Sequence, residues 1–278
     1  MDYIELSLPR PSDDQQAEIL IALLADLGFE GFAEEENTIL AYIPEKEFDR
    51  KKLDTFVAGS SLFEKTDVSV KHIADRNWNE AWESNYPAVW IEGRCYIRAP
   101  FHDPEPGAEY EILIKPKMAF GTAHHETTSL MIKMLLDMDV KGDRVLDMGC
   151  GTGILAILAY KKGAEKIVAI DNDDWAYRNV IENTGLNGAS SIEIRMGDSS
   201  ALKPDDRFDL ILANINKNIL LRDMDKYVET LAPKGRILFS GFFEEDLDDI
   251  KDRAKNCGLV FVSNDVKNRW TAAGFVKQ

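Results

Sequence analysis

The sequence predicts an α/β protein in which a doubly wound, mostly parallel seven-stranded sheet follows a small α+β domain. Three observations carry this prediction. Helices and strands alternate from residue 127 onward, and the strands are short apolar runs of the kind buried on both faces of a parallel sheet. A glycine-rich turn follows the first of these strands, at 149–153. In residues 1–75, by contrast, the apolar period changes repeatedly between two and 3.6 residues.

The first 75 residues are expected to form a separate acidic domain. Their elements come in the order strand, helix, strand, strand, helix, strand, which is the split βαβ order of ferredoxin-like folds. The domain holds 17 Asp and Glu against 7 Lys and Arg, and so supplies ten of the sixteen net negative charges. A basic partner suits such a domain. The expected elements are a strand at 3–8, a helix at 19–27 closed by Gly28, strands at 29–35 and 37–43, a helix at 45–56 and a strand at 68–72.

A connecting helix is expected at 76–88. Trp78, Trp82 and Tyr86 are spaced four apart there, which places them on one helix face. An aromatic stripe of this kind is more often packing than function, so it marks the seam between domains. The second domain, 89–278, begins with strand-like runs up to residue 115, which are expected to form an antiparallel extension of this domain.

The remaining elements of the second domain alternate regularly. In an open doubly wound sheet the ligand lies at the carboxyl ends of the strands, so we expect the functional site there. The expected elements are a helix at 127–137, a strand at 144–148, a helix at 154–162, a strand at 166–171, a helix at 174–184, strands at 191–196 and 208–214, a helix at 219–231, a strand at 236–242 and a hairpin of 258–265 with 269–277.

Composition narrows the range of functions. The 278 residues carry a net charge of −16, which works against nucleic-acid binding. No apolar run approaches the ~18 residues that span a bilayer, and the N-terminus lacks the pattern of a signal peptide, so a cytoplasmic protein without a membrane partner is expected.

Three distant cysteines argue against disulfides and a zinc site. No metal is expected at the adjacent His124 and His125, because no second histidine cluster accompanies them.

The segment VLDMGCGTGILAI, at 145–157, is the sharpest functional motif. A buried strand ends there, Gly149, Gly151 and Gly153 occupy alternate positions, and an apolar helix begins at once. Glycine is needed where a backbone turns tightly against a ligand, and a helix N-terminus adds unpaired N–H groups. The pattern is GxGxG, because Ile154 stands where a dinucleotide fingerprint has its third glycine. It favours a nucleoside with a short zwitterionic tail over a pyrophosphate; a turn that binds nothing is the alternative.

Two aspartates follow neighbouring strands. Asp171 ends the run KIVAID, 22 residues after Gly149, where a carboxylate can accept hydrogen bonds from both ribose hydroxyls. The alternative for Asp171 is a helix N-cap. Asp198, in MGDSS, could receive an adenine amino group, although Gly-Asp after a strand is often only a turn.

These motifs resemble a known family. VLDMGCGTGILAI, AIDNDDWA and DLILANI are similar to the motifs of class I S-adenosylmethionine-dependent methyltransferases, which are Rossmann-like. Upstream, MAFGTAHHETTSL at 118–130 resembles the signature of the PrmA family, the bacterial methyltransferases of ribosomal protein L11. The resemblance extends over nearly the whole chain, including the N-terminal domain and the tryptophan-containing connector. It implies S-adenosylmethionine as the cofactor, bound by Thr128, Gly149, Asp171 and Asn214 and, in the same glycine turn, by Gly151.

One position departs from the family pattern. Ala123 stands where the family usually has the second glycine of Gly-Thr-Gly. If the backbone has a positive φ at this position, an alanine there is strained. The substitution therefore bears on the conformation of this loop more than on the binding residues.

Asn214 is the candidate catalytic residue. Methyl transfer to a neutral amine needs alignment of the reacting groups more than proton chemistry. Asn214 ends the strand at 208–214 and offers an amide oxygen that can orient a free amine. The Ile-Asn-Lys that follows has no proline or aromatic residue to stack on a flipped base, which favours an aliphatic amine as the acceptor. The alternative for Asn214 is a cap of the next helix.

The expected function is transfer of methyl groups from S-adenosylmethionine to lysine side chains and the N-terminal amine of a ribosomal protein, which the resemblance gives as L11. Residues 1–75 are the expected recognition domain, and the protein is expected to be a monomer. Three alternatives stay open: a methyltransferase of another basic protein, a nicotinamide-dependent oxidoreductase, which the missing third glycine disfavours, and a catalytically silent adaptor for basic proteins.

Overall fold

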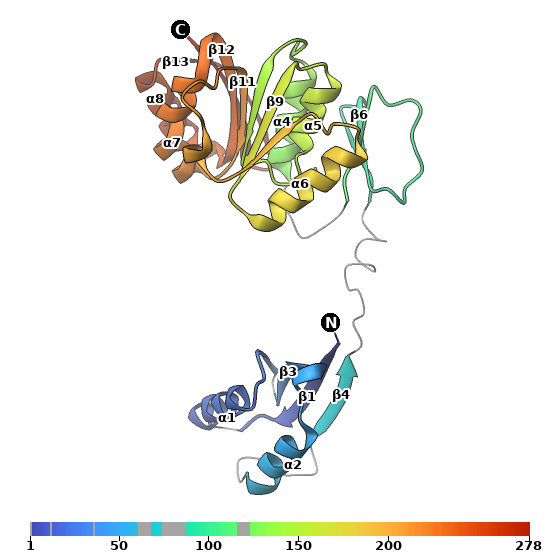
Figure 1. Ribbon diagram of the computed structural model, residues 1–278. Coiled ribbons are helices and arrows are strands. Elements are labelled where there is room, and N and C mark those ends of the chain that lie inside the picture. Colours follow the sequence, from blue (N-terminus) through green and yellow to red (C-terminus); the bar gives the residue numbers. More distant parts are fainter. Residues whose placement is uncertain (1, 12, 36, 61–67, 74–86, 116–122) are drawn as a thin grey trace. The chain divides into compact units, whose positions relative to one another are not determined.

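The chain folds into two compact units, Met1–Trp82 and Glu83–Gln278, and each is described by itself. The structure is a computed structural model that describes residues 2–11, 13–35, 37–60, 68–73, 87–115 and 123–278 (Figure 1). The connecting helix predicted at 76–88 falls almost entirely outside the described residues. Among the helices within those ranges, none has both the length and the apolar character needed to cross a membrane.

In its described residues, the small unit is a four-stranded antiparallel sheet with two helices. Strand β1 lies in the middle and pairs with β3 and β4, which gives the order β2-β3-β1-β4. Leu6 of β1 and Ala41 of β3 are paired and fully buried, and they pack in one core with Leu20 and Leu24 of α1. The predicted ferredoxin-like order is confirmed. The elements are β1 (Tyr3–Pro9), α1 (Asp14–Asp26), β2 (Gly31–Glu35), β3 (Thr38–Pro44), a 3₁₀ turn (Glu45–Glu47), α2 (Arg50–Gly59) and β4 (Ser69–Ile73).

The helix predicted at 45–56 is interrupted. A 3₁₀ turn ends before Phe48, whose backbone is extended, and α2 begins only after Asp49. The Asp49 carboxylate accepts hydrogen bonds from the backbone N–H groups of Lys51 and Lys52, at 2.9 and 3.3 Å. This is an N-cap, and it fixes the start of the helix at Arg50, five residues later than the apolar pattern indicates.

The large unit is built on a seven-stranded sheet in the order β10-β9-β8-β11-β12-β14-β13. Neighbouring strands from β10 to β12 are parallel, and β14 runs antiparallel to both its neighbours. The predicted mostly parallel, doubly wound sheet is confirmed. The elements are α4 (Glu126–Leu136), β8 (Arg144–Met148), α5 (Ile154–Lys161), β9 (Lys166–Asp171), α6 (Asp174–Leu186), β10 (Glu193–Met196), a 3₁₀ turn (Ser199–Ala201), β11 (Phe208–Asn214), α7 (Lys217–Thr230), β12 (Leu231–Phe243), a 3₁₀ turn (Glu244–Asp246), α8 (Leu247–Asn256), β13 (Leu259–Lys267) and β14 (Trp270–Lys277).

Helices cover both faces of the large sheet, so its central strands are buried on both sides (Figure 1). Val145 and Leu210 point into a core shared with α4 and α5, whereas Leu146 and Ile211 point into a second core shared with α7 and α8. The alternation follows from the two-residue period of a strand. Continuous apolar runs such as FDLILAN are therefore needed here, and polar residues are left for the strand ends.

The strand-like runs at 89–115 form strands of the large unit, as expected, but they lie outside its seven-stranded sheet and are only partly antiparallel. They form a separate three-stranded sheet of β5 (Val89–Ile91), β6 (Cys95–Arg98) and β7 (Tyr110–Leu113), in which β6 and β7 are parallel. The free edge of β7 is occupied by side chains of α6 and its end. The N–H groups of Leu113 and Lys115 donate to the amide oxygens of Asn187 and Asn183, both at 2.9 Å. Another strand cannot pair at this edge.

Helix α8 was missed by the sequence analysis. Its sequence, LDDIKDRAKN, is dominated by charged residues, and only Leu247, Ile250 and Ala254 are buried. Their spacing of three and four residues gives a narrow apolar stripe that packs in the core with α7. A helix at the surface needs no wider stripe than this.

Gly241 is expected to be essential for folding. It has φ of 93°, and a Cβ there would lie 2.3 Å from the backbone oxygen of Ile215. The Gly241→Ala substitution should therefore lower the free energy of unfolding by about 2–5 kcal/mol, from left-handed strain and overpacking together. The matched control is Gly185→Ala, within α6, where a Cβ meets no atom within 4 Å and should stabilise the helix by up to about 1 kcal/mol. Urea unfolding measures both; equal effects of the two substitutions would contradict the packing described here.

Candidate active site

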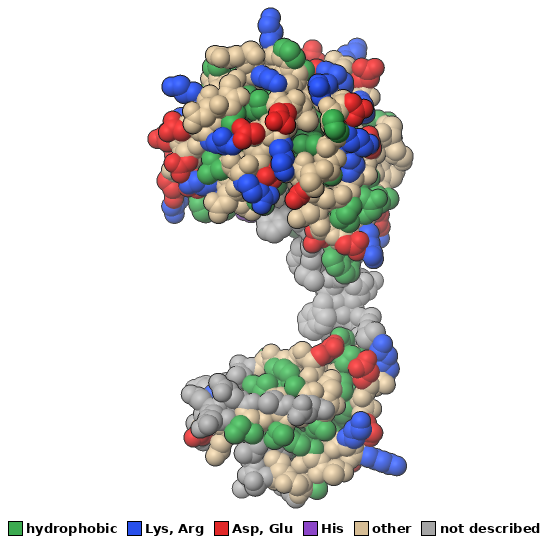
Figure 2. All heavy atoms as spheres, turned by 60° about the vertical axis from the view of Figure 1, so that its left-hand side comes forward, with side chains coloured by type: hydrophobic (Ala, Val, Ile, Leu, Met, Phe, Trp, Pro, Cys, Tyr) green, Lys and Arg blue, Asp and Glu red, His purple; other side chains and the backbone are tan. Residues whose placement is uncertain are grey.

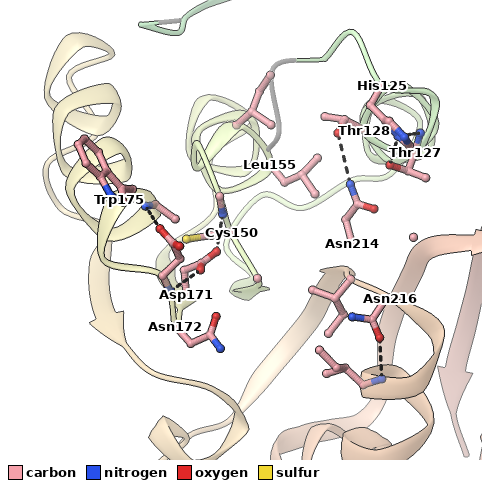
Figure 3. A pocket seen from close by; sticks show the side chains of 18 of the residues that line it. His125, Thr127, Thr128, Cys150, Leu155, Asp171, Asn172, Trp175, Asn214 and Asn216 are labelled. Carbon is pink, nitrogen blue, oxygen red and sulfur yellow. Dashed lines mark hydrogen bonds between the residues drawn. The ribbon is translucent and has the colours of Figure 1, made fainter. Parts of the chain in front are cut away.

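A cavity of about 540 Å³ lies at the carboxyl ends of four strands, β8, β9, β11 and β12 (Figure 3). Its size is that of a site for a small molecule. Figure 3 shows Asp171, Asn172 and Trp175 at one side of the cavity and His125, Thr128 and Asn214 at the other, with Leu155 of α5 between them. The position is the one predicted from the doubly wound pattern.

The glycine loop between β8 and α5 forms part of the cavity wall. Gly149 and Gly153 both have positive φ, and Cβ atoms on them would lie 2.2 Å from Ile215 Cγ2 and 2.5 Å from Val180 Cγ2. Only glycine lets the loop approach the end of β11 and the face of α6 so closely. Gly151 also has positive φ, and its backbone N–H points to the next strand.

The Asp171 carboxylate connects the glycine loop to the end of β9. One oxygen accepts a hydrogen bond from the Gly151 N–H at 2.8 Å, and the other accepts one from the Asp173 N–H at 3.0 Å. The helix cap that was the alternative role falls instead to Asp173, which accepts from the Ala176 N–H at 2.9 Å. A carboxylate has about four acceptor positions, so Asp171 keeps capacity for further donors in the cavity.

Asp147 lies beneath the glycine loop and is 1% exposed. One of its oxygens accepts a hydrogen bond from the Ala156 N–H of α5 at 3.0 Å. Burial, with a smaller contribution from the negative charge of Asp171, raises the pKa of Asp147 to about 7. A carboxyl group in this position is partly protonated at neutral pH.

Asn214 at the end of β11 and Thr128 of α4 are in contact on one side of the cavity. The Asn214 side-chain amide donates to the Thr128 hydroxyl at 3.3 Å. The amide oxygen of Asn214 is buried and accepts no hydrogen bond from any residue in the described part of the chain. The cap of α7 is Asn216, whose side chain accepts from the Ile219 N–H at 3.1 Å. Asn214 therefore holds an unused acceptor at the edge of the cavity, where leaving it unpaired is costly.

The start of α4 brings His125 to the cavity, a residue that the sequence analysis considered only as part of a histidine pair. His125 is the N-cap of this helix, and its Nδ1 accepts from the Thr127 N–H at 3.3 Å. His124 points to a different partner, with Nε2 3.1 Å from the Pro87 carbonyl oxygen. Ala123 has φ of 64°, so the strain expected for alanine at this position is present, at a cost of about 1–2 kcal/mol. Ser129 secures the turn by donating to the Ala123 carbonyl at 3.0 Å.

Asp198 does not line the cavity. Its carboxylate accepts from the Ser200 N–H at 2.8 Å and caps a 3₁₀ turn, which is the turn alternative considered for it. Contact with an adenine stays a prediction. Other lining residues were missed by the sequence analysis, among them Trp175 of α6, Gly241 of β12 and Trp270 of β14. Trp175 falls within the quoted motif AIDNDDWA but was not singled out there, whereas Gly241 and Trp270 reach the cavity through strand packing that no local motif indicates.

The cavity suits a cationic ligand. Asp171 and Asp173 line it, and among the described lining residues none is lysine or arginine. The thiol of Cys150 also lines the cavity, and burial raises its pKa well above the usual range, so it stays protonated. A pyrophosphate would meet two carboxylates without a compensating cation, whereas a positively charged ligand meets complementary charge.

The sheet order, the glycine loop after β8 and the acidic residue that ends β9 together define a class I S-adenosylmethionine-dependent methyltransferase fold. A family model, ribosomal protein L11 methyltransferase (PrmA), matches residues 13–278. The chain therefore belongs to the PrmA family, and the resemblance inferred from its motifs is confirmed.

Individual relatives support the same assignment. The chain is 45% identical over 280 residues to a ribosomal protein L11 methyltransferase of Bacteroides fragilis, covering 99% of this chain and 100% of that protein. It is 47% identical over 263 residues to the one of Porphyromonas gingivalis, covering 93% and 90%. A crystal structure of ribosomal protein L11 methylase from Lactobacillus delbrueckii subsp. bulgaricus matches with a TM-score of 0.64 and 30% identity, over 69% of this chain and 99% of that chain.

The buried Asp147 predicts a specific pH dependence of stability. Its folded-state pKa of about 7 lies above the ordinary value of 3.8, so folding binds a proton between these values. The free energy of unfolding should fall as pH rises from about 4 to about 7 and level off above that. The Asp147→Asn variant keeps an acceptor for the Ala156 N–H and cannot ionise. Relative to wild type, it should gain about 2–3 kcal/mol between pH 5 and pH 8 in urea unfolding.

The control for this experiment is Asp205→Asn, at an exposed position. This variant is expected to keep the pH dependence of the wild type. A difference between Asp147→Asn and wild type that stays constant from pH 5 to pH 8 would contradict the raised pKa.

Proposed function

We propose that this chain transfers methyl groups from S-adenosylmethionine to lysine side chains and the N-terminal amine of ribosomal protein L11. The observation that carries the proposal is that Asn214 lines the same cavity as the glycine loop and Asp171, and that its buried amide oxygen accepts no hydrogen bond from any described residue. Membership in the PrmA family supports the choice of substrate. We also propose that the protein acts as a monomer, since one chain supplies the whole cavity lining described here. We propose the cytoplasm as its location.

The residues present fit S-adenosylmethionine. Asp171 would accept the ribose hydroxyls, and the loop at Gly149 and Gly151 would lie against the nucleoside without side chains in the way. Thr128 and Asn214 would hold the amino acid end. The acidic lining and the absence of lysine and arginine among the described lining residues agree with a ligand that carries a positive sulfur.

Bound S-adenosylmethionine would supply a methyl group activated by a positively charged sulfur. The task left to the chain is alignment of the acceptor amine, which Asn214 would perform by accepting an amine N–H through its free amide oxygen. Thr128 would fix the Asn214 amide by accepting a hydrogen bond from its nitrogen. We assign removal of the amine proton to solvent.

The nicotinamide-dependent oxidoreductase is disfavoured by the same cavity. A dinucleotide needs its pyrophosphate bound, yet Ile154 replaces the third glycine of the fingerprint and is 1% exposed. No lysine or arginine in the described lining offsets the charge of a pyrophosphate. Both features agree with a cationic ligand that has no phosphate.

We assign recognition of the substrate to residues 1–75, connection to 76–88 and catalysis to 89–278. The first segment holds 17 acidic and 7 basic residues, whereas 76–278 holds 32 and 26 and is nearly balanced. Acidic and basic side chains are interspersed over the face of the large unit shown in Figure 2. On α1, Ile19 and Leu23 are 47% and 39% exposed, as expected of a surface that binds another protein.

The ribose role of Asp171 predicts a loss of cofactor affinity. Asp171→Ala should weaken S-adenosylmethionine binding roughly 30- to 150-fold, because charge-assisted hydrogen bonds to the ribose contribute about 2–3 kcal/mol. Isothermal titration calorimetry measures the affinity. The control is Asp174→Ala, three residues along the chain, where the carboxylate is exposed and pairs with Arg178. Near-normal affinity of Asp171→Ala would count against the ribose role.

The substrate is tested by mixing the full chain with labelled S-adenosylmethionine and undermethylated ribosomal proteins. Mass spectrometry should find the label on ribosomal protein L11, at lysine and N-terminal amines. A variant lacking residues 1–75 should bind S-adenosylmethionine with unchanged affinity and fail to label L11. Label on a different protein would overturn the substrate, cofactor binding without any label would favour the adaptor, and full activity of the shortened chain would overturn the recognition role.

A further inference from the structure

Four flat side chains pack against one another at one end of the cavity and are called the stack below: His125, Phe243, Arg269 and Trp270. The Trp270 ring lies 4.1 Å from that of Phe243 at an interplanar angle of 34°, and it meets the His125 ring edge-on at 4.8 Å and 67°. The Arg269 guanidinium lies over the Phe243 ring, 5.5 Å from its centre. Trp270 and His125 both line the cavity. The indole is thus held from two directions while part of it borders open space.

The backbone fixes the position of this stack. Asn268 and Arg269 both have positive φ, 49° and 68°, so they form a tight hairpin turn that delivers Trp270 as the first residue of β14. Trp270 is paired in register with Phe243 of β12. The turn is tied down at both residues: the Asn268 amide donates to a Glu126 carboxylate oxygen at 2.9 Å, and Arg269 forms an ion pair with Glu245.

The stack marks the acceptor end of the cavity. Asp171 and the glycine loop occupy the end assigned to the nucleoside, whereas His125, Thr128 and Asn214 lie together at the other end (Figure 3). Trp270 touches His125 and so belongs to this second end. An amine bound at Asn214 would lie in a cavity that the Trp270 indole also lines.

We propose that Trp270 is the wall that holds the alkyl chain and the charged nitrogen of the acceptor, and that it favours amines already methylated. This inference rests on the proposed function. Each transfer forms a C–N bond as a C–S bond breaks, leaves the sulfur a neutral thioether and puts the positive charge on nitrogen, which loses a proton to water before the next transfer. A methylated ammonium is larger and more weakly hydrated than a primary one, and tryptophan binds such cations best among the aromatic residues.

A purely structural role is the competing explanation, because Trp270 also packs against the core that α4 and α5 cover. The two roles differ in what they discriminate. A structural residue affects every ligand alike, whereas an aromatic wall separates a cation from a neutral molecule of the same shape. The test therefore compares trimethyl-lysine amide with its neutral tert-butyl isostere.

The experiment uses the full chain saturated with S-adenosylhomocysteine, and follows the indole N–H signals by NMR. Trp270→Leu should weaken binding of trimethyl-lysine amide about 5- to 30-fold and change that of the isostere less than about twofold. Trp270→Phe, which keeps an aromatic face, should rank between wild type and Trp270→Leu. The control is Trp90→Leu, since Trp90 of β5 packs on Tyr96 of β6 in the three-stranded sheet and does not line the cavity. On L11, Trp270→Leu should shift the product from trimethyl toward monomethyl amines.

Equal losses for the cation and the isostere, or no loss for either, would overturn the proposal. If Trp270→Leu does not fold, Trp270→Phe decides: an unchanged ratio of the two affinities overturns the wall. Failure of the wild type to methylate L11, together with a Trp270 signal that responds to trimethyl-lysine amide, would overturn the proposed function and leave the wall standing. If Trp270→Leu methylates L11 as the wild type does, the role proposed for Trp270 is overturned and the proposed function stands.

Discussion

The architecture of the site depends on the hydrogen bond from the Gly151 N–H to the Asp171 carboxylate. This bond joins the loop after β8 to the end of β9, and it holds the loop in the position where Gly149 touches Ile215 at the end of β11. The bond lies at the edge of a cavity, where a carboxylate and a backbone amide interact more strongly than in water. With this loop displaced, neither the strand ends nor the start of α5 would enclose a ligand.

The parts of the site that follow strand ends could be predicted from sequence. Asp171, the glycine loop and Asn214 each follow a buried apolar run, and the carboxyl ends of parallel strands meet at one edge. Choosing among roles for each residue needed the structure. Asp173 and Asn216, two residues beyond Asp171 and Asn214, turned out to be the helix caps, which leaves both candidates free to face the cavity.

The rest could not be predicted because it depends on contacts between distant segments. His125 reaches the cavity by capping α4, and Trp270 does so through a hairpin turn paired with β12. The separate sheet of β5, β6 and β7 has its free edge taken by Asn183 and Asn187, which lie about 70 residues further along the chain. Helix α8 hides a narrow apolar stripe among charges. Local sequence patterns predict which residues are buried, but they do not predict which segment of the chain covers them.

The central claim is that one crevice holds an adenosyl group at Asp171 and presents its reactive end to the free oxygen of Asn214. A crystal structure of the full chain grown with S-adenosylhomocysteine tests it most directly. The account predicts electron density in the cavity, with both ribose hydroxyls at about 2.5–3.2 Å from the Asp171 carboxylate and the sulfur on the side of Asn214. Density for the ligand outside the cavity, or within it with the ribose turned away from Asp171, would contradict the account.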